Sequence, residues 1–271
     1  MYSDLFNIEN KVAVVTGGTG VLGGAIIKGL VKAGVKVAIV GRNVENAMLL
    51  SEELHDVGDT MIFQGDVLDE GQMDQLKNAV LERWGKVDIL INAAGGNLPG
   101  AVIPPDKTIL DLNIDDMRKV LELNYLGTVI PTQQLLPVFI EQNAGIIINI
   151  SSLTAQRPMT RTAGYSAAKA AIDNYTMWLA VDLANKFGEG IRVNAIAPGV
   201  FLTRQNKSLL TNEDGSLTDR GKTITDHTPF RRFGKPEELT GTVIWLCSDA
   251  SKFVTGTIVH VDGGFHAYSG V

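Results

Sequence analysis

The alternation of short apolar runs with amphipathic segments restricts the fold of this chain more than any other feature. Most of the runs are rich in valine and isoleucine, and several are apolar at every position, as in strands that are covered on both faces. The segments between them have the length and spacing of helices. Strands that alternate with helices form right-handed crossovers, so the pattern predicts an α/β fold with a doubly wound, mostly parallel sheet and helices on both faces.

The predicted elements alternate along the whole chain. Strands are expected at Val12–Val15, Val35–Val40, Met61–Gln64, Val87–Ile91, Gly145–Ile150, Ile191–Ala195 and Ile258–Val261. Helices are expected at residues 21–33, 44–57, 70–84, 114–142, 163–187 and 236–248. Pro131 and Pro137 lie inside the fourth of these helices, and a proline removes a helical hydrogen bond, so we expect a kink or a break there.

Two long irregular stretches follow predicted strands, at Gly95–Asn113 and Pro198–Pro229. Sheets of this kind bind ligands at the carboxyl ends of their strands, and long loops inside a domain are usually functional. The 271 residues contain no internal repeat and no low-complexity linker. We therefore expect a single domain over residues 1–271, with a substrate loop at about 198–229.

The composition excludes several classes of protein. The net charge is −6, so the surface as a whole does not attract nucleic acid or an anionic membrane. The single cysteine, Cys247, permits no internal disulfide, and no cysteine–histidine cluster has zinc spacing. No apolar run reaches the roughly 18 residues of a membrane span, and the first residues lack the basic and apolar parts of a signal peptide. We expect a cytoplasmic protein without a bound metal.

A glycine-rich turn links the first predicted strand to the first predicted helix. It consists of Gly17, Gly18, Thr19, Gly20, Val21, Leu22 and Gly23. Glycines let the backbone approach a pyrophosphate, and the helix N-terminus offers free N–H groups and the positive end of a dipole. In this context the spacing Gly18-x-Gly20-x-x-Gly23 indicates a dinucleotide site of the Rossmann type, and a purely structural turn is the alternative.

The residues after the second strand bear on the choice of cofactor. An acidic residue at this point would bind the adenosine ribose and repel a 2′-phosphate. The chain has Gly41 there, followed by Arg42 and Asn43. Because a guanidinium can pair with a 2′-phosphate, we favour NADP(H), while NAD(H), dual use and a merely solvated Arg42 stay open.

Tyr165 and Lys169 lie four residues apart in a predicted helix, and therefore on the same face. A free phenol has a pKa of about 10, and a neighbouring cation lowers it. Bringing the pKa toward 7 takes about 4 kcal/mol, which Lys169, a nicotinamide cation and a dry cleft can supply together but Lys169 alone cannot. Ser151 and Ser152 follow the buried run Ile146–Ile150, where a hydroxyl can orient a substrate oxygen or simply cap a turn.

Together these residues resemble the single-domain short-chain dehydrogenase/reductase family over about Asn7–Phe265. The motifs that carry the resemblance are Thr16-Gly17 through Gly23, Asp66-Val67, Asn92-Ala93-Ala94-Gly95, Asn124-x-x-Gly127, Ser152, Tyr165-x-x-x-Lys169, Pro198-Gly199 with Thr203, and Asp262-Gly263-Gly264. Their order and spacing together are specific, although each motif alone is not. The family's catalytic serine lies thirteen positions before the tyrosine, which selects Ser152.

The resemblance implies an oxidoreductase in which Tyr165 exchanges a proton with the substrate oxygen. It further implies that Lys169 binds the nicotinamide ribose and depresses the phenol pKa, that Ser152 orients the carbonyl or hydroxyl, and that Asn124 holds a water in a proton relay. Implied cofactor contacts outside the glycine turn are Asp66 and Val67 at the adenine, Asn92, Ala93, Ala94 and Gly95 in the cleft, and Pro198, Gly199, Val200 and Thr203 near the carboxamide. Structural roles for Asn124 and Pro198-Gly199 are the alternative.

Two positions depart from the family pattern. Val21 stands where the turn Thr-Gly-x-x-x-Gly-x-Gly has its second glycine, so the turn is expected to differ in shape. Ala93 replaces the second asparagine of Asn-Asn-Ala-Gly. Both departures concern the contacts with the cofactor, and neither touches the proton chemistry.

The rim of the active site is expected to come from residues 95–113, 153–164 and 200–228. Its polar candidates, besides Ser152, are Asn97, Gln156, Arg157, Arg161, Arg204, Asn206 and Lys207. Several cations near one cleft suit a hydroxylated substrate that bears a carboxylate, whereas each residue alone is typical of a solvated loop. The glycine turn and Ala93–Asn97 are similar to the fructuronate reductase (mannonate oxidoreductase) branch of the family, which implies a keto-uronic acid and a hexonic acid as reactants.

Other interpretations stay open. Other sugars, polyols, gluconate-type alcohols and acyl thioesters are alternative substrates. A nucleotide-sensing protein without catalysis, or an epimerase or dehydratase, would be a different class on the same fold. The resemblance also implies a homotetramer, whose interface, if these residues are not core, would include Tyr175, Trp178, Leu179 and the run Phe253–Phe265.

Overall fold

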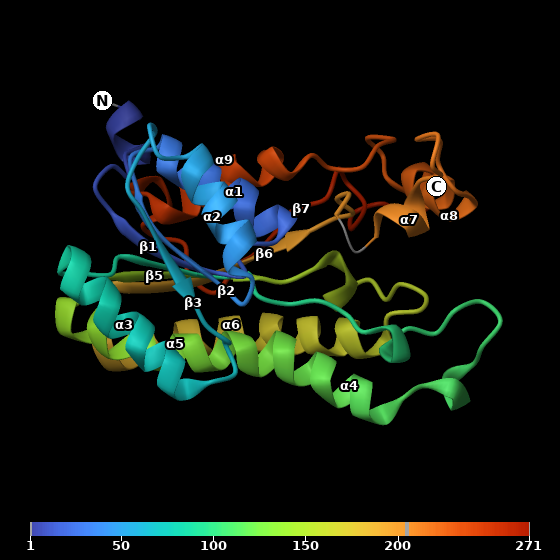
Figure 1. Cartoon of the computed structure of the whole chain (residues 1–271), viewed down its shortest axis with the longest axis horizontal. Helices are drawn as coiled ribbons and strands as arrows, with labels where there is room; N and C mark the ends of the chain where they lie inside the picture. Colours follow the sequence, from blue (N-terminus) through green and yellow to red (C-terminus); the bar gives the residue numbers. More distant parts are fainter. Residues whose placement is uncertain (1, 204–205, 271) are drawn as a thin grey trace.

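The valine- and isoleucine-rich runs form one parallel sheet in the computed structural model, which describes residues 2–203 and 206–270 (Figure 1). The strands are β1 (Val12–Thr16), β2 (Lys36–Gly41), β3 (Thr60–Gln64), β4 (Ile89–Asn92), β5 (Gly145–Ile150), β6 (Ile191–Pro198) and β7 (Ile258–Val261). Their order across the sheet is β3-β2-β1-β4-β5-β6-β7. The direction of winding reverses between β1 and β4, so the predicted doubly wound α/β fold is confirmed.

Alternate side chains of each strand face two separate cores. On β1, Ala13 and Val15 point to one core, and Val12 and Val14 point to the other. The first core is covered by α1 (Val21–Lys32), α2 (Val44–Glu53) and α9 (Thr240–Cys247). The second is covered by α3 (Glu70–Trp84), α5 (Gly127–Gln142) and α6 (Ala163–Phe187). Figure 1 shows these two helical layers on opposite sides of the sheet, which explains why the central strands are apolar at consecutive positions.

The helix predicted at residues 114–142 is interrupted, but not at its prolines. It consists of α4 (Ile114–Leu121), a π turn at Glu122–Leu126, and α5. The expected break was wrong, because α5 continues through Pro131 and Pro137. The π turn lies directly before α5, which contains Pro131. Threonine hydroxyls donate hydrogen bonds to backbone carbonyls of the π turn and of the first turn of α5. Thr128 Oγ1 donates to Asn124 O at 2.9 Å, and Thr132 Oγ1 donates to Thr128 O at 2.8 Å.

The stretch after β6 is more ordered than the sequence pattern indicates. It contains two helices that were not predicted, α7 (Lys207–Leu210) and α8 (Asp219–His227). The Thr218 hydroxyl caps α8 by accepting a hydrogen bond from Gly221 N at 3.1 Å. The buried side of α8 is small, with Ile224 as its one large apolar residue, so no apolar periodicity announces this helix. Arg204, one of the predicted rim residues, lies outside the described residues.

Several expectations concern features away from the site. Cys247 is fully buried, and burial raises the pKa of its thiol to about 12, which agrees with its prediction as a small core residue. Across residues 2–203 and 206–270, no helix is both long and apolar enough to cross a membrane. The same residues contain no group of three or more histidine, cysteine, aspartate or glutamate side chains arranged to hold a metal ion.

Candidate active site

The carboxyl ends of three neighbouring strands are tied together by polar side chains. Thr16 of β1 pairs in register with Asn92 of β4, and Asn92 pairs with Asn149 of β5. The Asn92 amide donates to Asn149 Oδ1 at 2.9 Å, and Thr16 Oγ1 accepts hydrogen bonds from Ala93 N and Ala94 N at 3.2 and 3.3 Å. The Asn92 side chain therefore points into the interior and supports the cleft from behind, at the point where the winding of the sheet reverses.

The glycine turn packs closely against neighbouring backbone of the same chain. Gly17 has φ +65°, and a Cβ there would lie 2.5 Å from Ala93 O. A Cβ on Gly23 would lie 2.4 Å from Gly17 O. Gly20 is the N-cap of α1 and supplies no side-chain hydrogen bond, so the helix terminus stays open, beside a cavity of about 320 Å³ lined in part by Gly18–Val21. A turn of glycines, which carry no side chains, and an uncapped helix N-terminus are features that suit a pyrophosphate.

Gly41, at the end of β2, packs closely against the side chain of Thr19. A Cβ on Gly41 would lie 2.9 Å from both Cγ2 and Oγ1 of Thr19. Arg42 is 70% exposed at its side chain, and its Nη1 lies 3.9 Å from Asp66 Oδ2. An ion pair this exposed and this long holds the guanidinium only weakly, so Arg42 is free to meet an anionic ligand.

Other residues predicted to bind the cofactor have structural contacts. Asn43 caps α2, because its side chain accepts a hydrogen bond from Asn46 N at 2.9 Å. Val67 is buried in the core beneath α3 and α5. The structure shows Asn43 as a helix cap and Val67 as a core residue, and their contacts with a cofactor stay a prediction.

The segment after β6 is fastened to β7. Pro198 ends β6, and Gly199 N donates to Val261 O at 2.9 Å. A Cβ on Gly199 would lie 2.6 Å from the Cα of Asp262, so only glycine fits this approach. Val200 O accepts a hydrogen bond from Gly234 N at 3.0 Å, and Thr203 N donates to Asn206 Oδ1 at 2.8 Å.

The first two turns of α6 carry the phenol and the ammonium predicted from the sequence. Tyr165 and Lys169 lie one turn apart, and Lys169 Nζ is 5.5 Å from the centre of the Tyr165 ring. Lys169 is only 4% exposed and donates to Ile150 O at 2.7 Å. A Cβ on Gly95 would lie 2.6 Å from Asn124 Oδ1 and 3.4 Å from Lys169 Nζ. The structure therefore brings these residues together from α6, β5, the π turn and the loop after β4.

Burial works against the charged form of both groups in the pair. It raises the pKa of the Tyr165 phenol above its usual value, and a hydrogen bond with the Ser152 hydroxyl opposes that rise. It lowers the pKa of Lys169 to about 8, and the nearby Asp173 carboxylate opposes that fall. Lys169 alone therefore does not make the phenol acidic, which agrees with the expectation that it needs a further cation in the cleft.

Ser152 has its lone pairs occupied and its proton available. Its Oγ accepts hydrogen bonds from Thr154 N at 3.2 Å and from Thr154 Oγ1 at 3.0 Å. With both lone pairs used, the hydroxyl proton points toward the Tyr165 phenol or another oxygen at that place. Thr154 was not predicted, because a threonine two residues after a serine carries no signal in the sequence.

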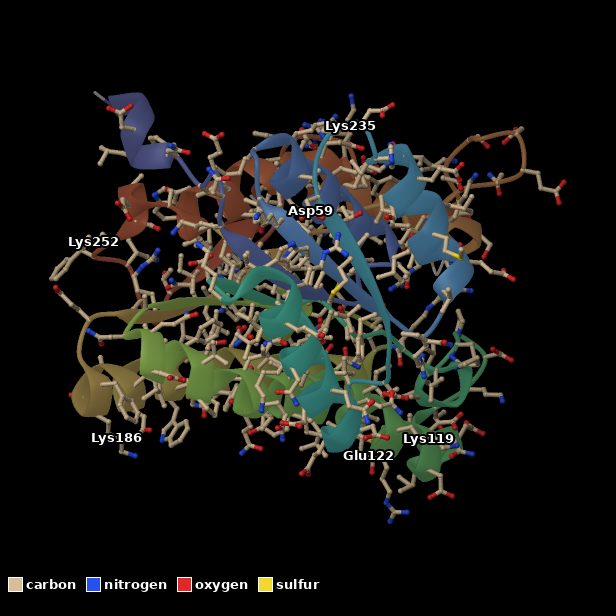
Figure 2. The ribbon with its side chains drawn as sticks, turned by 60° about the vertical axis from the view of Figure 1, so that its left-hand side comes forward. Asp59, Lys119, Glu122, Lys186, Lys235 and Lys252 are labelled. Carbon is tan, nitrogen blue, oxygen red and sulfur yellow. The ribbon has the colours of Figure 1, made fainter. Side chains whose placement is uncertain are left out.

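Asn124 lies in the π turn, which aims its side chain at the loop after β4. Its amide donates to Gly96 O and to Val120 O, both at 2.8 Å, and its Oδ1 accepts from Gly96 N at 3.2 Å. The side chain is completely buried and clamps the loop beside Lys169. Figure 2 shows Lys119 of α4 and Glu122 of the π turn at the outer edge of the molecule, whereas Asn124 is buried.

Several predicted substrate residues make hydrogen bonds within the protein. Gln156 Nε2 donates to Asp173 Oδ2 at 3.0 Å, and Arg157 Nε donates to His266 O at 3.1 Å. Asn206 Nδ2 donates to Phe201 O at 2.8 Å, which closes a small loop before α7. The remaining predicted rim residues, which are partly or fully exposed, are Asn97, Arg161 and Lys207.

Two arginines from distant segments are brought near each other by the contact of Arg220 with Thr160. Arg220 of α8 donates to Thr160 Oγ1 at 3.1 Å and to Thr160 O at 3.3 Å. Arg161 follows directly, with φ +78°, and its carbonyl accepts a hydrogen bond from Ile103 N at 3.1 Å. Burial and then the charge of Arg161 lower the pKa of Arg220. Among the described residues, neither guanidinium has an ion-pair partner.

The chain is similar over nearly its whole length to known oxidoreductases. Residues 19–266 match the family model described as enoyl-(acyl carrier protein) reductase. The uncharacterized oxidoreductase UxuB of Bacillus subtilis (strain 168) is 43% identical over 275 residues, with 98% of each chain covered.

Two solved structures extend this similarity to bound cofactors. A "putative D-Mannonate oxidoreductase" from Haemophilus influenza with bound NAD has a TM-score of 0.91 at 39% identity, and 98% of each chain is covered. A gluconate 5-dehydrogenase from Burkholderia cenocepacia J2315 in complex with NADP and tartrate has a TM-score of 0.85 at 30% identity, with 98% of this chain and 99% of the other covered.

Proposed function

Since this chain belongs to the short-chain dehydrogenase/reductase family and is a nicotinamide-dependent oxidoreductase, we propose that its substrate is a hydroxylated acid. The reaction is the interconversion of a secondary alcohol and a ketone on a sugar acid, with mannonate and fructuronate as the favoured pair. The observation that carries this proposal is the pair formed by Arg161 and Arg220, two neighbouring cations without a carboxylate partner among the described residues. The similarity to a protein described as a D-mannonate oxidoreductase supports it.

The proton chemistry is assigned to the phenol of Tyr165. A bound nicotinamide supplies or accepts the hydride. In ketone reduction Tyr165 gives its proton to the carbonyl oxygen, and in alcohol oxidation it takes the hydroxyl proton. The lone pairs of Ser152 are used by Thr154. Its hydroxyl therefore donates a hydrogen bond to the same substrate oxygen and holds that oxygen beside the phenol. Lys169 favours the phenolate by its charge and donates to the cofactor ribose.

Asn124 and the loop beside it keep this arrangement in place. Its side chain exchanges hydrogen bonds with both the N–H and the C=O of Gly96, so Gly95 packs against Lys169 Nζ. In the proposed relay, a water held by Asn124 returns the proton of Tyr165 to solvent past the lysine ammonium. The amide thus positions the loop, and the relay role stays a prediction.

We favour NADP(H) as the cofactor, with NAD(H) as the alternative. Within residues 2–203 and 206–270, the exposed guanidinium of Arg42 has its long contact with Asp66 as its one ion pair, and it can pair with a 2′-phosphate in two hydrogen bonds. Glycine at position 41 leaves this place without the acidic side chain that would repel the phosphate. The two similar structures contain NAD in one case and NADP in the other, so the preference rests on Arg42.

The acid group of the substrate is assigned to Arg161 and Arg220. Placing two guanidiniums together costs free energy, and an anion between them removes that cost. The backbone strain at Arg161, whose φ of +78° is unusual for an arginine, is held by the bond to Ile103 N. Arg220 lies on α8, inside the region 198–229, so this region serves as the substrate loop of a single-domain enzyme. The tartrate in the gluconate 5-dehydrogenase structure supports a carboxylate ligand.

The test is a substrate panel followed at the 340 nm absorbance band of the reduced nicotinamide. The panel contains fructuronate, other keto-uronates, ketogluconates, neutral keto sugars and enoyl thioesters. Wild type is compared with Arg220→Gln and Arg161→Gln. The control is Arg83→Gln, because Arg83 belongs to another part of the sequence and already pairs with Asp59. The two rim variants are expected to raise KM for acids about 10- to 100-fold and to leave neutral substrates unaffected.

Each other outcome has a definite meaning. Preference for neutral sugars or thioesters would overturn the acid substrate while leaving the oxidoreductase in place. Tight cofactor binding without turnover of any carbonyl would favour a nucleotide-sensing protein. Equal KM values for acids in all variants would remove the two arginines from substrate binding.

We also propose a homotetramer. Trp178 and Val181 are 58% and 62% exposed on one side of α6, and Phe253 is fully exposed, so apolar surface is available for contact with other copies. Leu179, also considered for the interface, belongs instead to the core. Sedimentation analysis of wild type and Trp178→Asp tests this assembly, and a wild-type monomer would refute it.

A further inference from the structure

A buried carboxylate lies one helical turn beyond Lys169, outside the motifs predicted from the sequence. Asp173 follows Lys169 at the i+4 position of α6 and is 6% exposed. Ser151 Oγ donates to its Oδ1, and Gln156 Nε2 donates to its Oδ2 at 3.0 Å. Both carboxylate oxygens therefore accept hydrogen bonds from uncharged donors.

The neighbouring ammonium lacks an anion of its own. Lys169 Nζ has three N–H donors, and its acceptor is the neutral carbonyl oxygen of Ile150, at 2.7 Å. Within the described part of the chain it forms no ion pair. A buried cation without an opposite charge tends to lose its proton. Asp173 is the anion that acts on Lys169, and burial otherwise lowers the pKa of this lysine to about 8.

We propose that Asp173 is a positioning residue that keeps Lys169 charged beneath the cofactor cleft. It acts at a distance through its charge and leaves the lysine donors free to face Gly95 and the cleft. Ser151 fixes the carboxylate against the helix, because its hydroxyl donates to Asp173 and lies 3.5 Å from the backbone carbonyl oxygen of Lys169. This inference rests on the proposed role of Lys169 and not on the identity of the substrate.

The other titratable groups near Asp173 do not take the place of Lys169 as its charged partner. His260 of β7 and His266 stack at 4.0 Å between ring centres, and both Asp173 and Asp262 act on His260. Burial first, and then His266, lower the pKa of His260, so both Asp173 and Asp262 face a neutral imidazole at neutral pH. The remaining group is the Tyr165 phenol, which carries no charge until its proton leaves. Lys169 is thus the cation that the Asp173 charge stabilises.

The experiment follows Lys169 directly. The protein is labelled with ¹³C at lysine Cε, the Lys169 resonance is identified by its loss in Lys169→Arg, and its titration is recorded for wild type and Asp173→Asn. Removing the charge is expected to lower the Lys169 pKa by about one unit, and Asp173→Glu is expected to restore it. The pH profile of kcat/KM is then recorded with whichever substrate is turned over, and its high-pH limb is expected to move down by the same amount.

Two controls separate charge from geometry. Ser151→Ala and Gln156→Leu each remove a hydrogen bond to Asp173 but keep its charge, so the Lys169 pKa is expected to stay near the wild-type value. If Asp173→Asn does not fold, as judged by thermal unfolding, Asp173→Ser replaces it. An unmoved Lys169 titration in a folded, uncharged variant would overturn the proposal, and so would an equal shift in Ser151→Ala. Because the titration needs no substrate, failure of the sugar-acid assignment leaves it intact.

Discussion

The Lys169 ammonium lies 5.5 Å from the centre of the Tyr165 ring, yet the pKa of the phenol is raised and not lowered. Both side chains lie where burial disfavours their charged forms, and only Ser152 and Asp173 oppose this. The fold therefore holds a phenol and an ammonium ready for use, and the remaining driving force must come from what enters the cleft.

Replacing Tyr165 by phenylalanine tests the proton role. Tyr165→Phe is expected to lower kcat at least about 100-fold, because no other acid takes the place of the phenol, while cofactor affinity measured by fluorescence stays nearly the same. Tyr175→Phe is the control, since this tyrosine lies farther along α6 and packs against Tyr125 and Trp178. Normal turnover in Tyr165→Phe would refute the assignment.

Removing the buried ammonium is expected to make the protein more stable and inactive. The Lys169 pKa falls from 10.5 to about 8 on folding, so the charge costs about 3 kcal/mol below pH 8. Lys169→Met avoids this cost but loses the bond to Ile150 O, for a net gain of about 1–2 kcal/mol in unfolding free energy at pH 7.

The same linkage gives a pH dependence. Between pH 8 and 10.5 the unfolded chain holds the proton of Lys169 more tightly than the folded one, so this group makes wild type more stable as pH rises through that window. Denaturant titrations at pH 7 and pH 10 measure both effects. A stability gap between Lys169→Met and wild type that does not narrow at pH 10 would contradict the burial argument.

Arg42→Ala tests the choice of cofactor. Loss of a charge-assisted contact with a 2′-phosphate is expected to raise KM for NADPH about tenfold or more and to leave KM for NADH unchanged. Arg83→Ala is a matched control, because this arginine is also exposed and paired with an aspartate. Steady-state kinetics with both cofactors decide the matter, and an unaltered NADPH preference in Arg42→Ala would discard the role of Arg42.

Gly95→Ala tests the packing of the loop on the catalytic lysine. The added Cβ would lie 2.6 Å from Asn124 Oδ1 and 3.4 Å from Lys169 Nζ, so the amide that clamps Gly96 must move. Turnover is expected to fall about 100-fold, with weaker cofactor binding. Gly241→Ala in α9 has no heavy atom within 4 Å of the new Cβ, and it should keep full activity and gain about 0.5–1 kcal/mol in stability. Equal activity of the two variants would argue against this packing.

The strands and most helices could be predicted because burial on both faces leaves a clear apolar signal. Val12–Val15 and Ile146–Ile150 are examples, and both became buried strands. The meeting of Tyr165 with Lys169 follows from helical spacing alone, and Ser152 came from the family motif. The polar helix α8 and the π turn lack such a pattern and were missed.

The parts of the site that were missed depend on contacts between distant segments. Arg220 lies 60 residues from Thr160, to which it bonds, and no local pattern marks that pair. In the sequence Asp173 is an ordinary polar position of a helix, and only the structure shows its hydrogen bonds with Ser151 and Gln156. Gln156 and Arg157 were predicted as rim residues by position; each makes one hydrogen bond within the protein, and their role toward a substrate stays a prediction.

The π turn at Glu122–Leu126 sets the rotational phase between α4 and α5. Each residue turns an α-helix by about 100°, so one extra residue lets α4 face α6 beside Gly164 while α5 faces α3 and the sheet. Deleting a single residue there would leave a regular helix but swing every side chain of α4 about 100° away from the start of α6. The length of this segment is therefore as critical as its composition, and insertions or deletions in it should be tolerated far less than substitutions.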